Sequence, residues 1–504
     1  MVRPFASSRL RRDMNSTRKL WALWCLLVFG LFNVYGPPLE SYKTAADPAN
    51  ISTQELAHRL TPLQFLGVLQ RADSDTARYY SYAEAMLGRS YSTFYVRKVE
   101  DWTADSAAAD EARVFPNVVP TRPLLPWRDF SMEYPPGMAV FALAPALLTQ
   151  DFKLYHLLFG LEMELLLTLS VFCAVKAVEQ LAPGRGAQTL LIALGVTAAL
   201  GFVAARRYDA CVSASFGLTL LALAARRPGA AGASLALGIV AKGAPILIAP
   251  LGAMHYAATR RWREIFASLA GAGAVCLVAG LAYLALAGDH WRDSFAYHGA
   301  RPLQIESTWS SLLILLSALQ PSIVSGSVYT FGSDNIVSAY EPLLRPIAET
   351  APYLATLAVF AWFWRAQRDC ASEFERIVAL AKGACAIVVA YSTLGKVFSP
   401  QYLVWLTPIA AVASLRSTRQ TKVLLFAGLG LSQLEYPYFY TIFAAGLPPA
   451  FGLLALLRNG ALIVWAGRLL LSPPEAQAPA AQAPDAQAPE AQALEAPAVE
   501  TQPA

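Results

Sequence analysis

The sequence predicts an all-α polytopic membrane protein with about 12 transmembrane helices, within a range of about 10–13. Composition is the first observation: 56% of the 504 residues are hydrophobic and 15% are charged, whereas soluble domains carry roughly 25% charged residues. The second is a rapid succession of apolar runs after Gly137, and the third is that basic residues recur in the links between them. A soluble enzyme and a mainly disordered chain are both excluded, because each would be far more polar.

The charge balance and the cysteines exclude two further classes. The net charge is +5, from 40 Lys and Arg against 35 Asp and Glu, which is too small to predict nucleic-acid binding. The six cysteines are scattered without C-x-x-C spacing and mostly lie in apolar runs. They are therefore expected to be core residues rather than a disulfide framework or a zinc site.

The amino terminus has a basic segment followed by an apolar run. Residues 1–19 are expected in the cytoplasm, because basic flanks of a membrane helix stay inside. Residues 20–36 predict the first transmembrane helix. A signal peptide is the alternative, but no good small-residue cleavage site follows the apolar run, since the chain continues Gly36-Pro37-Pro38, and this favours an uncleaved helix.

Residues 37–136 are the only long polar stretch before the carboxyl-terminal tail. Because they follow an in-to-out helix, we expect a large extracytoplasmic loop with membrane-surface helices and catalytic residues. A loop of this length is unusual without a function. The apolar run Gly137–Leu148 that follows is shorter than the roughly 20 residues of a span. It predicts a membrane-surface or re-entrant helix.

Residues 137–471 are expected to form the polytopic transmembrane domain. With about 12 spans, five basic links all fall on the cytoplasmic side, as do both termini. The expected location is the plasma membrane. The links contain Arg185, Arg226 and Arg227, Arg260, Arg261 and Arg263, Arg365 and Arg368, and Arg416, Arg419 and Lys422. The expected spans are Tyr155–Val175, Gln188–Ala205, Ala210–Ala225, Ala230–Ala241, Ala244–Tyr256, Ile265–Ala287, Ile347–Trp364, Phe374–Leu394, Tyr402–Leu415, Val423–Leu434 and Phe451–Leu471.

Residues 472–504 form a tail of different composition. Glu475–Ala493 repeats a five-residue unit of the form x-Ala-Gln-Ala-Pro, without aromatic residues and without an apolar face. Nothing in this repeat drives packing, so it predicts a disordered Ala/Pro/Gln-rich cytoplasmic tail. A docking role is the alternative.

Several charged and polar residues fall on the expected outer side. Ionisable residues at membrane depth are costly and usually face a cavity or a partner, so their gathering predicts one polar cavity at the outer interface. Cations near carboxylates suit an anionic, phosphate-bearing substrate. The structural alternative for each residue is snorkelling or a loop-closing ion pair. The residues are Asp73, Asp75, Arg128, Asp129, Glu133, Arg206, Arg207, Asp209, Lys242, His290, Asp293, His298, Arg301, Gln304, Glu306 and Lys396.

The segment Trp127–Gly137 resembles the aromatic-Arg-Asp-Phe…Glu-Tyr-Pro-Pro signature of integral-membrane GT-C glycosyltransferases. In particular, it resembles the polyprenyl-phosphate-mannose-dependent mannosyltransferases of glycosyltransferase family 87. The chain departs from the family pattern at Trp127, where Tyr is commoner, and in a long insert at Val96–Pro126. Further similar blocks follow in the expected order: Asp75–Tyr79, Arg207–Asp209, Lys242–Pro245, Arg301–Ser307 and Ser399–Trp405.

The resemblance implies roles for individual residues. Asp75 is the candidate general base, with Asp73 as an alternative, and His298 is either an assisting group or a structural histidine. A divalent metal is possible, but no ligand spacing indicates one and none is expected to be required. The candidates for binding the donor phosphate are Arg206, Arg207, Lys242, Arg301 and Lys396. The candidates for positioning the sugar or the loop are Arg128, Asp129, Glu133, Tyr134, Asp209, Gln304 and Glu306.

The function implied by the resemblance is hexosyl transfer. The hexose, expected to be mannose, would move from a polyprenyl-phosphate sugar to a glycolipid or polysaccharide acceptor on the extracytoplasmic face, with inversion of the anomeric centre. The expected partners are this lipid donor, the glycan acceptor and the bilayer. A polytopic transporter or lipid flippase is the alternative. The enzyme is favoured because the sequence shows no repeat between its halves and the outer charges cluster around a large loop.

Overall fold

The computed structural model describes residues 17–31, 74–93, 95–97, 117–204, 207–440 and 446–472. The described residues all belong to one compact unit. Two candidate site residues, Asp73 and Arg206, lie outside the described residues, as do 1–16 of the basic terminus and 473–504 of the predicted tail.

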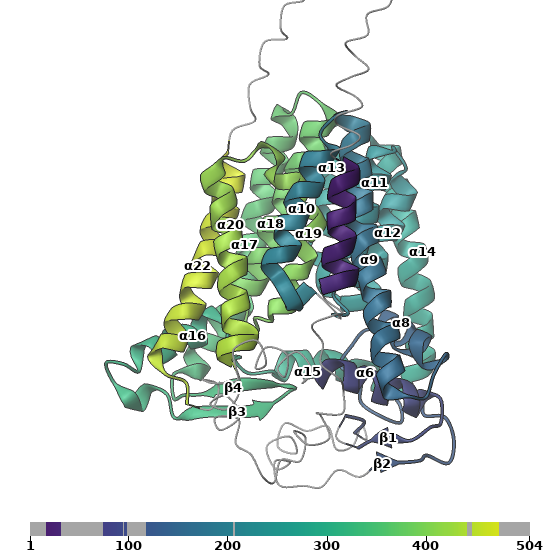
Figure 1. The fold of residues 1–504 in the computed structure, drawn as a ribbon, viewed down its shortest axis with the longest axis vertical. Helices are drawn as coiled ribbons and strands as arrows, with labels where there is room; N and C mark the ends of the chain where they lie inside the picture. The colour runs from purple at the N-terminus through teal and green to yellow at the C-terminus, as the bar shows by residue number, and fades with distance from the viewer. Residues whose placement is uncertain are drawn as a thin grey trace, which may run out of the picture. The chain divides into compact units, whose positions relative to one another are not determined.

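Most of the described chain is helical and forms a bundle (Figure 1). Four described helical segments are long and apolar enough to cross a membrane: Phe152–Leu181, Trp262–Ala300, Glu373–Leu394 and Pro449–Leu471. The chain is therefore a helical membrane protein, and the total of about 12 spans stays a prediction. The bundle helices are α9 (Phe152–Leu181), α10 (Gly186–Leu200), α11 (Ala210–Ala224), α12 (Pro228–Lys242), α13 (Ala249–Ala257), α14 (Trp262–Ala287), α17 (Glu341–Asp369), α18 (Glu373–Leu394), α19 (Leu406–Ala413), α20 (Arg419–Gln433) and α22 (Pro449–Leu471).

Short 3₁₀ and π segments lie at the ends of many helices and in the links between them. The predicted pair Ala230–Ala241 and Ala244–Tyr256 corresponds to α12 and α13, and Gly243, with a φ of 75°, ends α12. The predicted span Tyr402–Leu415 is divided, because a 3₁₀ turn precedes the short, fully buried helix α19. These segments are η1 (Leu26–Leu31), η4 (Gly201–Ala204), η5 (Ala244–Leu247), η6 (Gly288–Arg292), η7 (Pro321–Ile323), η8 (Pro400–Trp405), η9 (Ser414–Arg416) and η10 (Leu434–Phe439).

Small residues let neighbouring helices approach closely. A methyl group at Gly232 on α12 would collide with the carbonyl oxygen of Ser268 on α14, and one at Gly271 would collide with the backbone of Gly229. Such small-residue contacts are typical of membrane helices, which gain little from burying apolar surface against each other in lipid. The outward side of α14 carries exposed apolar side chains, including Phe266, as expected for a lipid-facing helix.

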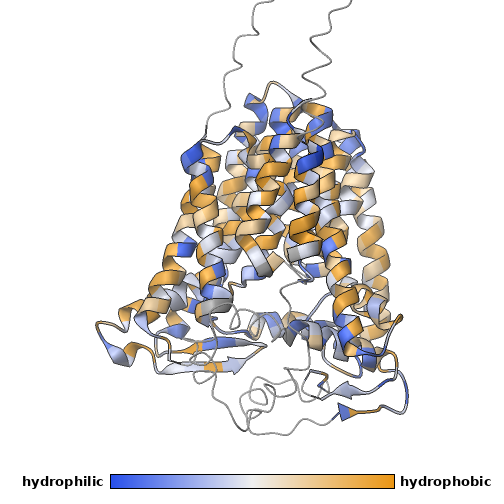
Figure 2. Cartoon of the chain, viewed as in Figure 1, coloured by the Kyte–Doolittle hydropathy of each residue, from blue (hydrophilic) through white to orange (hydrophobic). Residues whose placement is uncertain are grey.

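One end of the bundle carries a layer of short elements (Figure 1). Hydrophilic residues concentrate at both ends of the bundle, with a hydrophobic band between them (Figure 2). The layer contains α6 (Ser74–Met86), β1 (Tyr91–Ser92), β2 (Asn117–Val118), α8 (Gly137–Ala146), α15 (Asp293–Ala300), α16 (Thr308–Leu316), β3 (Gly326–Thr330) and β4 (Ser333–Val337).

Two short antiparallel strand pairs are present that the all-α prediction did not include, and the second of them is a hairpin. β1 pairs with β2, and β3 pairs with β4 from Gly326 opposite Val337 to Thr330 opposite Ser333. Phe331 and Gly332 both have positive φ, of 52° and 69°, which fits the two-residue type I′ turn that closes tight hairpins. Strands this short leave little periodicity in the sequence, which is why they were missed.

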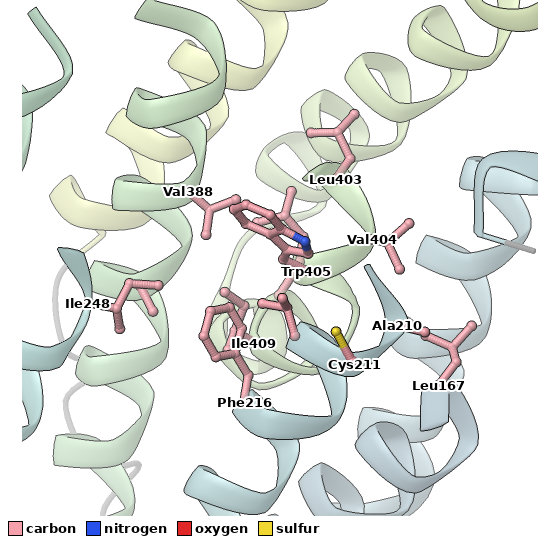
Figure 3. Close-up of a cluster of buried hydrophobic side chains, with 14 of the residues drawn as sticks. Leu167, Ala210, Cys211, Phe216, Ile248, Val388, Leu403, Val404, Trp405 and Ile409 are labelled. Atoms are coloured by element: carbon pink, nitrogen blue, oxygen red, sulfur yellow. The ribbon is translucent and has the colours of Figure 1, made fainter. Parts of the chain in front are cut away.

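The apolar core lies between α9, α11, α18 and the η8–α19 segment. Figure 3 shows Trp405 packed among Val388, Ile409 and Phe216, with Cys211 nearby. All six cysteines are free thiols; Cys173, Cys211, Cys370 and Cys385 are buried, as expected of core residues, whereas Cys25 and Cys276 are exposed. The indole Nε1 of Trp405 donates a hydrogen bond of 2.6 Å to Asp209 Oδ1, so the core also supports the polar site described next.

Candidate active site

One cavity of about 1110 Å³ lies where the layer of short elements meets the bundle. Its walls come from α6, the segment 133–136, the α12–η5 junction, α14, α15, the β3–β4 hairpin and the segments 299–306 and 395–405. Side chains far apart in the sequence therefore share one space. Ten predicted site residues line it: Asp75, Glu133, Tyr134, Arg207, Lys242, His298, Arg301, Gln304, Glu306 and Lys396.

Asp75 stands in the first turn of α6 and is paired with Arg207. Its Oδ2 lies 2.7 Å from Nη1 of Arg207, and both side chains keep some exposure, 22% and 12%. Nη2 of Arg207 donates a hydrogen bond of 3.2 Å to the hydroxyl of Tyr436. The pair joins the first loop to the bundle and holds a carboxylate and a cation together at the cavity wall.

A second ion pair lies one helical turn further along α6. Nη1 of Arg78 is 2.5 Å from Oε1 of Glu133, and the hydroxyl of Tyr82 donates a hydrogen bond of 2.6 Å to Oε2. Burial raises the pKa of Glu133, but the Arg78 charge and these hydrogen bonds outweigh it, so the pKa falls below its ordinary value. Nε2 of His298 donates to the backbone carbonyl of Glu133 at 2.9 Å. Glu133 thus anchors α6 and α15 at the cavity.

Lys242 ends α12 within a cage of aromatic rings. Its Nζ lies 2.8 Å from Oδ2 of the fully buried Asp209. The ring centroids of Tyr134, Tyr208 and Tyr402 lie 5.8, 5.4 and 5.6 Å from the same nitrogen. Asp209 does not line the cavity. It is the buried counter-ion that holds the Lys242 side chain in place. A cation at the last turn of a helix is also favoured by the helix dipole.

Lys396 and Arg301 supply further positive charge to the cavity. Nζ of Lys396 donates to the carbonyl of Gly299 at 2.7 Å and lies 3.0 Å from Oε1 of Glu349. Nη2 of Arg301 donates to Oγ of Ser333 at 2.9 Å. Together with Arg207 and Lys242, these side chains place four cations on the walls of one cavity, which suits a phosphate group.

Arg128 and Asp129 lie away from the cavity. Both carboxylate oxygens of Asp129 accept hydrogen bonds from Arg122, at 2.8 and 2.9 Å, and Oδ2 also accepts one from the Leu125 amide. The Arg122 hydrogen bonds lower the pKa of Asp129. Arg128 is exposed. This geometry favours the loop-positioning interpretation of Asp129 over contact with a sugar.

Two further predicted outer residues, His290 and Asp293, pair with each other and do not line the cavity. His290 Nδ1 lies 2.9 Å from Asp293 Oδ2, three residues along the chain.

Three charged residues at or behind the cavity were not predicted from the sequence: Arg78, Asp334 and Arg458. Arg78 is three residues after Asp75 on one helix face, and Arg458 is a charge within an apolar helix, so both had a detectable signal. Asp334 had none, because its hairpin was not predicted.

No group of three or more His, Cys, Asp and Glu side chains in the described part of the chain is arranged to hold a metal ion. The expectation that no metal is required stays a prediction.

A bundle of apolar helices with a polar, cation-lined cavity at one end defines an integral-membrane protein built to handle a charged substrate. The sequence model of glycosyltransferase family 87 matches residues 133–400, more than half of the 504-residue chain. The chain therefore belongs to glycosyltransferase family 87 and is a membrane glycosyltransferase of the GT-C type. This membership favours the enzyme over the transporter alternative.

Solved structures show a remote likeness. The crystal structure of ArnT from Cupriavidus metallidurans in the apo state is 15% identical, with a TM-score of 0.38, over 78% of this chain and 72% of that chain. ArnT from the same organism bound to undecaprenyl phosphate is 14% identical, with a TM-score of 0.39, over 81% of this chain and 78% of that chain. No curated protein sequence matches the chain.

Proposed function

We propose that this glycosyltransferase moves a hexose, mannose being the expected sugar, from a polyprenyl-phosphate donor to a glycolipid or polysaccharide acceptor. The reaction takes place on the extracytoplasmic face of the plasma membrane and inverts the anomeric centre. The observation that carries the proposal is the single cavity that joins the Asp75–Arg207 pair with Lys242 and an apolar wall. The family resemblance supplies the choice of mannose.

The proposed chemistry uses Asp75 as the general base. The carboxylate takes the proton of the acceptor hydroxyl as its oxygen attacks the anomeric carbon. The new carbon–oxygen bond forms as the bond to the phosphate oxygen breaks, and the electron pair leaves with the polyprenyl phosphate. Arg207, Lys242 and Arg301 stabilise the negative charge that develops there. Phosphate is a good leaving group, so no general acid is needed.

An apolar wall supports a lipid-linked donor. The cavity is bordered by Ile246 and Leu247 of η5 and by Cys276 and Ala279 of α14. Ile246 and Cys276 are both exposed, and α14 carries further exposed apolar side chains, among them Leu277, Val278 and Leu281. A phosphate among the cations would therefore have its hydrocarbon chain beside the bilayer. A water-soluble nucleotide sugar has no hydrocarbon chain that could contact this apolar wall.

The order of the helices supports an extracytoplasmic position of the cavity. The turns α9–α10, α11–α12, α13–α14, α17–α18 and α19–α20 lie at the end of the bundle opposite the cavity (Figure 1). These are the five links with basic residues, which stay in the cytoplasm by the positive-inside rule. The cavity then opens on the extracytoplasmic side, where nucleotide sugars are absent and a lipid-linked donor is required.

The test is direct transfer by the purified full-length chain in lipid nanodiscs. Decaprenyl-phosphate mannose is supplied with mannolipid and mannan acceptors, and free decaprenyl phosphate and glycosylated product are quantified by mass spectrometry. We expect equal amounts of both products and an α-linkage from a β-linked donor. Transfer from GDP-mannose but not from the lipid, or a retained anomeric configuration, would contradict the proposal.

A further inference from the structure

Helix α20 continues as the π segment η10, and this segment is interrupted at Tyr436, a residue of the cavity wall. Tyr436 has a φ of −123° and a ψ of 123°, which are extended rather than helical angles. It precedes Pro437, and a residue before proline is disfavoured in the helical region. The Tyr-Pro dipeptide therefore accounts for the interruption. Because π segments within helices are frequent at functional sites, the role of Tyr436 deserves a physical explanation.

Contacts on both sides of Tyr436 fix its position. The preceding residue, Glu435, is fully buried and forms an ion pair with the fully buried Arg458 of α22. On the other side, the ring of Tyr440 lies 5.6 Å from that of Tyr436 in an edge-to-face arrangement. The hydroxyl of Tyr440 donates a hydrogen bond of 2.6 Å to Oδ2 of Asp334 in β4. Through these neighbours, Tyr436 is anchored to α22 and to the β3–β4 hairpin.

Tyr436 and Asp75 hold the same guanidinium group. Nη1 of Arg207 donates to Oδ2 of Asp75 at 2.7 Å, and Nη2 donates to the hydroxyl of Tyr436 at 3.2 Å. The centre of the guanidinium group lies 5.9 Å from the centroid of the Tyr436 ring, within the range of a cation–π contact. Arg207 lies in the link between η4 and α11 rather than in a helix. The orientation of its side chain therefore depends on the partners of the guanidinium group.

The two partners of Arg207 respond differently to the proposed reaction. Hydrogen bonds to an ionised acceptor are roughly twice as strong as those between neutral groups. When Asp75 takes the proton of the acceptor hydroxyl, its carboxyl group becomes neutral and its hold on Arg207 weakens. The hydroxyl of Tyr436 takes no part in this proton transfer, so its hydrogen bond to Arg207 persists. The departing phosphate needs the positive charge of Arg207 in the same step.

We propose that Tyr436 is a positioning residue that keeps Arg207 at the departing phosphate while Asp75 becomes protonated. This assignment rests on the proposed function and adds to it a residue to which the sequence assigned no role. Tyr436 acts on the reaction through Arg207 and not on the reacting atoms. A purely structural tyrosine would contribute equally whether Asp75 is charged or neutral, and this difference separates the two roles.

The experiment measures equilibrium binding of decaprenyl phosphate to the purified full-length chain in lipid nanodiscs. Asp75→Asn imitates the protonated carboxyl group, because the amide is neutral and of the same size. Tyr436→Phe removes the hydroxyl and is prepared both in the wild-type chain and in Asp75→Asn. Tyr80→Phe is the matched control, since the Tyr80 hydroxyl donates to the Gln150 carbonyl and Tyr80 does not line the cavity. Thermal unfolding of each variant verifies that it is folded.

We expect Tyr436→Phe to weaken the binding of decaprenyl phosphate by at most about threefold in the wild-type chain and by about tenfold in Asp75→Asn. Non-additivity of this kind is the signature of two residues that share one partner. Tyr80→Phe should change the affinity in neither background. An equal change in both backgrounds, a larger loss in the wild-type chain or tighter binding would overturn the proposal.

A third background tests whether Tyr436 acts through Arg207. Arg207→Lys keeps the positive charge but lacks the second nitrogen that donates to Tyr436. When Asp75→Asn also carries Arg207→Lys, the addition of Tyr436→Phe should change the affinity by less than about twofold. A tenfold loss that persists in this background would assign Tyr436 to a different contact and would contradict the positioning role.

Two comparisons separate this inference from the proposed function. If the affinities are non-additive but the wild-type chain transfers no sugar, Tyr436 still orients Arg207 for the phosphate and only the proposed transfer fails. If the wild-type chain transfers mannose from the lipid but the affinities are additive, only the positioning role fails. If the wild-type chain does not bind decaprenyl phosphate, both proposals are wrong.

Discussion

The two ends of the helical bundle use the same types of charged residue in opposite ways. At the end away from the cavity, His255 is fully buried, with Nδ1 3.2 Å from Gln367 Oε1 and Nε2 3.0 Å from Glu373 Oε1. Arg261 reaches the same Glu373 carboxylate at 3.2 Å, and Arg416 pairs with Glu375 at 3.0 Å. This cluster ties α13, α14, α17 and α18 together.

At the cavity end, by contrast, ion pairs border open space. Asp75, Arg207 and Lys242 have protein partners and still line the cavity. The difference teaches that charge in a membrane protein is not by itself a sign of function. Charges that only join helices are structural, while charges that join helices and face a cavity are available to a substrate.

The largest expected effect is that of Asp75→Asn on transfer. The amide keeps the size of the side chain but cannot take the proton of the acceptor hydroxyl, so turnover should fall by about 10²–10⁴-fold. Glu373→Gln at the opposite end is the matched control, and should keep its turnover per folded molecule. The measurement is the initial rate of decaprenyl phosphate release. Wild-type turnover in Asp75→Asn would remove Asp75 from the mechanism.

A smaller loss is expected for Lys242→Met. The variant keeps the length of the side chain and its place in the aromatic cage, but removes the charge that faces the cavity. Because Asp209 is then buried without its cation, Lys242→Arg is needed as a charge-conserving comparison. We expect decaprenyl phosphate to bind about 10–100-fold more weakly to Lys242→Met, and the arginine variant to recover part of this affinity. Equal affinity of all three proteins, measured by equilibrium binding, would exclude Lys242 from phosphate binding.

Much of the contrast between the two ends of the bundle was predictable from the sequence. The positive-inside rule assigned the basic links to one end, and the apolar runs located most of the bundle helices. Sixteen charged and polar residues were expected at one site because they fell on the side that this rule left without basic links. Nine of them line the cavity, whereas Arg128, Asp129, Asp209, His290 and Asp293 do not. Their roles remain proposals.

What sequence could not predict is how pairs form across long separations. Arg207 meets Asp75, 132 positions away, and Arg458 supports Glu306 from 152 positions away. No local periodicity records such contacts, since they depend on how helices pack. The β3–β4 hairpin was missed for a related reason, because five-residue strands beside apolar helices leave too weak a pattern.

A substitution at the end of the bundle opposite the cavity should lower the stability of the fold but not the rate of sugar transfer. Glu373→Gln removes the carboxylate that accepts from Arg261 and contacts the buried His255. Loss of charged hydrogen bonds of this kind costs about 1–3 kcal/mol, so the apparent melting temperature should fall. Transfer, corrected for the folded fraction, should stay at the wild-type level. A loss of transfer without a loss of stability would show that this cluster acts on the cavity and would break the contrast between the two ends.

The smallest effect expected is a change in acid stability through Glu133. The pKa of Glu133 in the folded chain lies below its ordinary value of 4.5. The Arg78–Glu133 pair therefore stabilises the fold fully above about pH 4.5, and this contribution is lost as pH falls through the lower pKa of the folded state. Glu133→Gln lacks this titration. The difference in melting temperature between wild type and Glu133→Gln should therefore be largest near neutral pH and shrink below pH 4.5. A difference that stays constant down to pH 3 would show that the pair contributes through packing, and would place it with the structural charges of the opposite end.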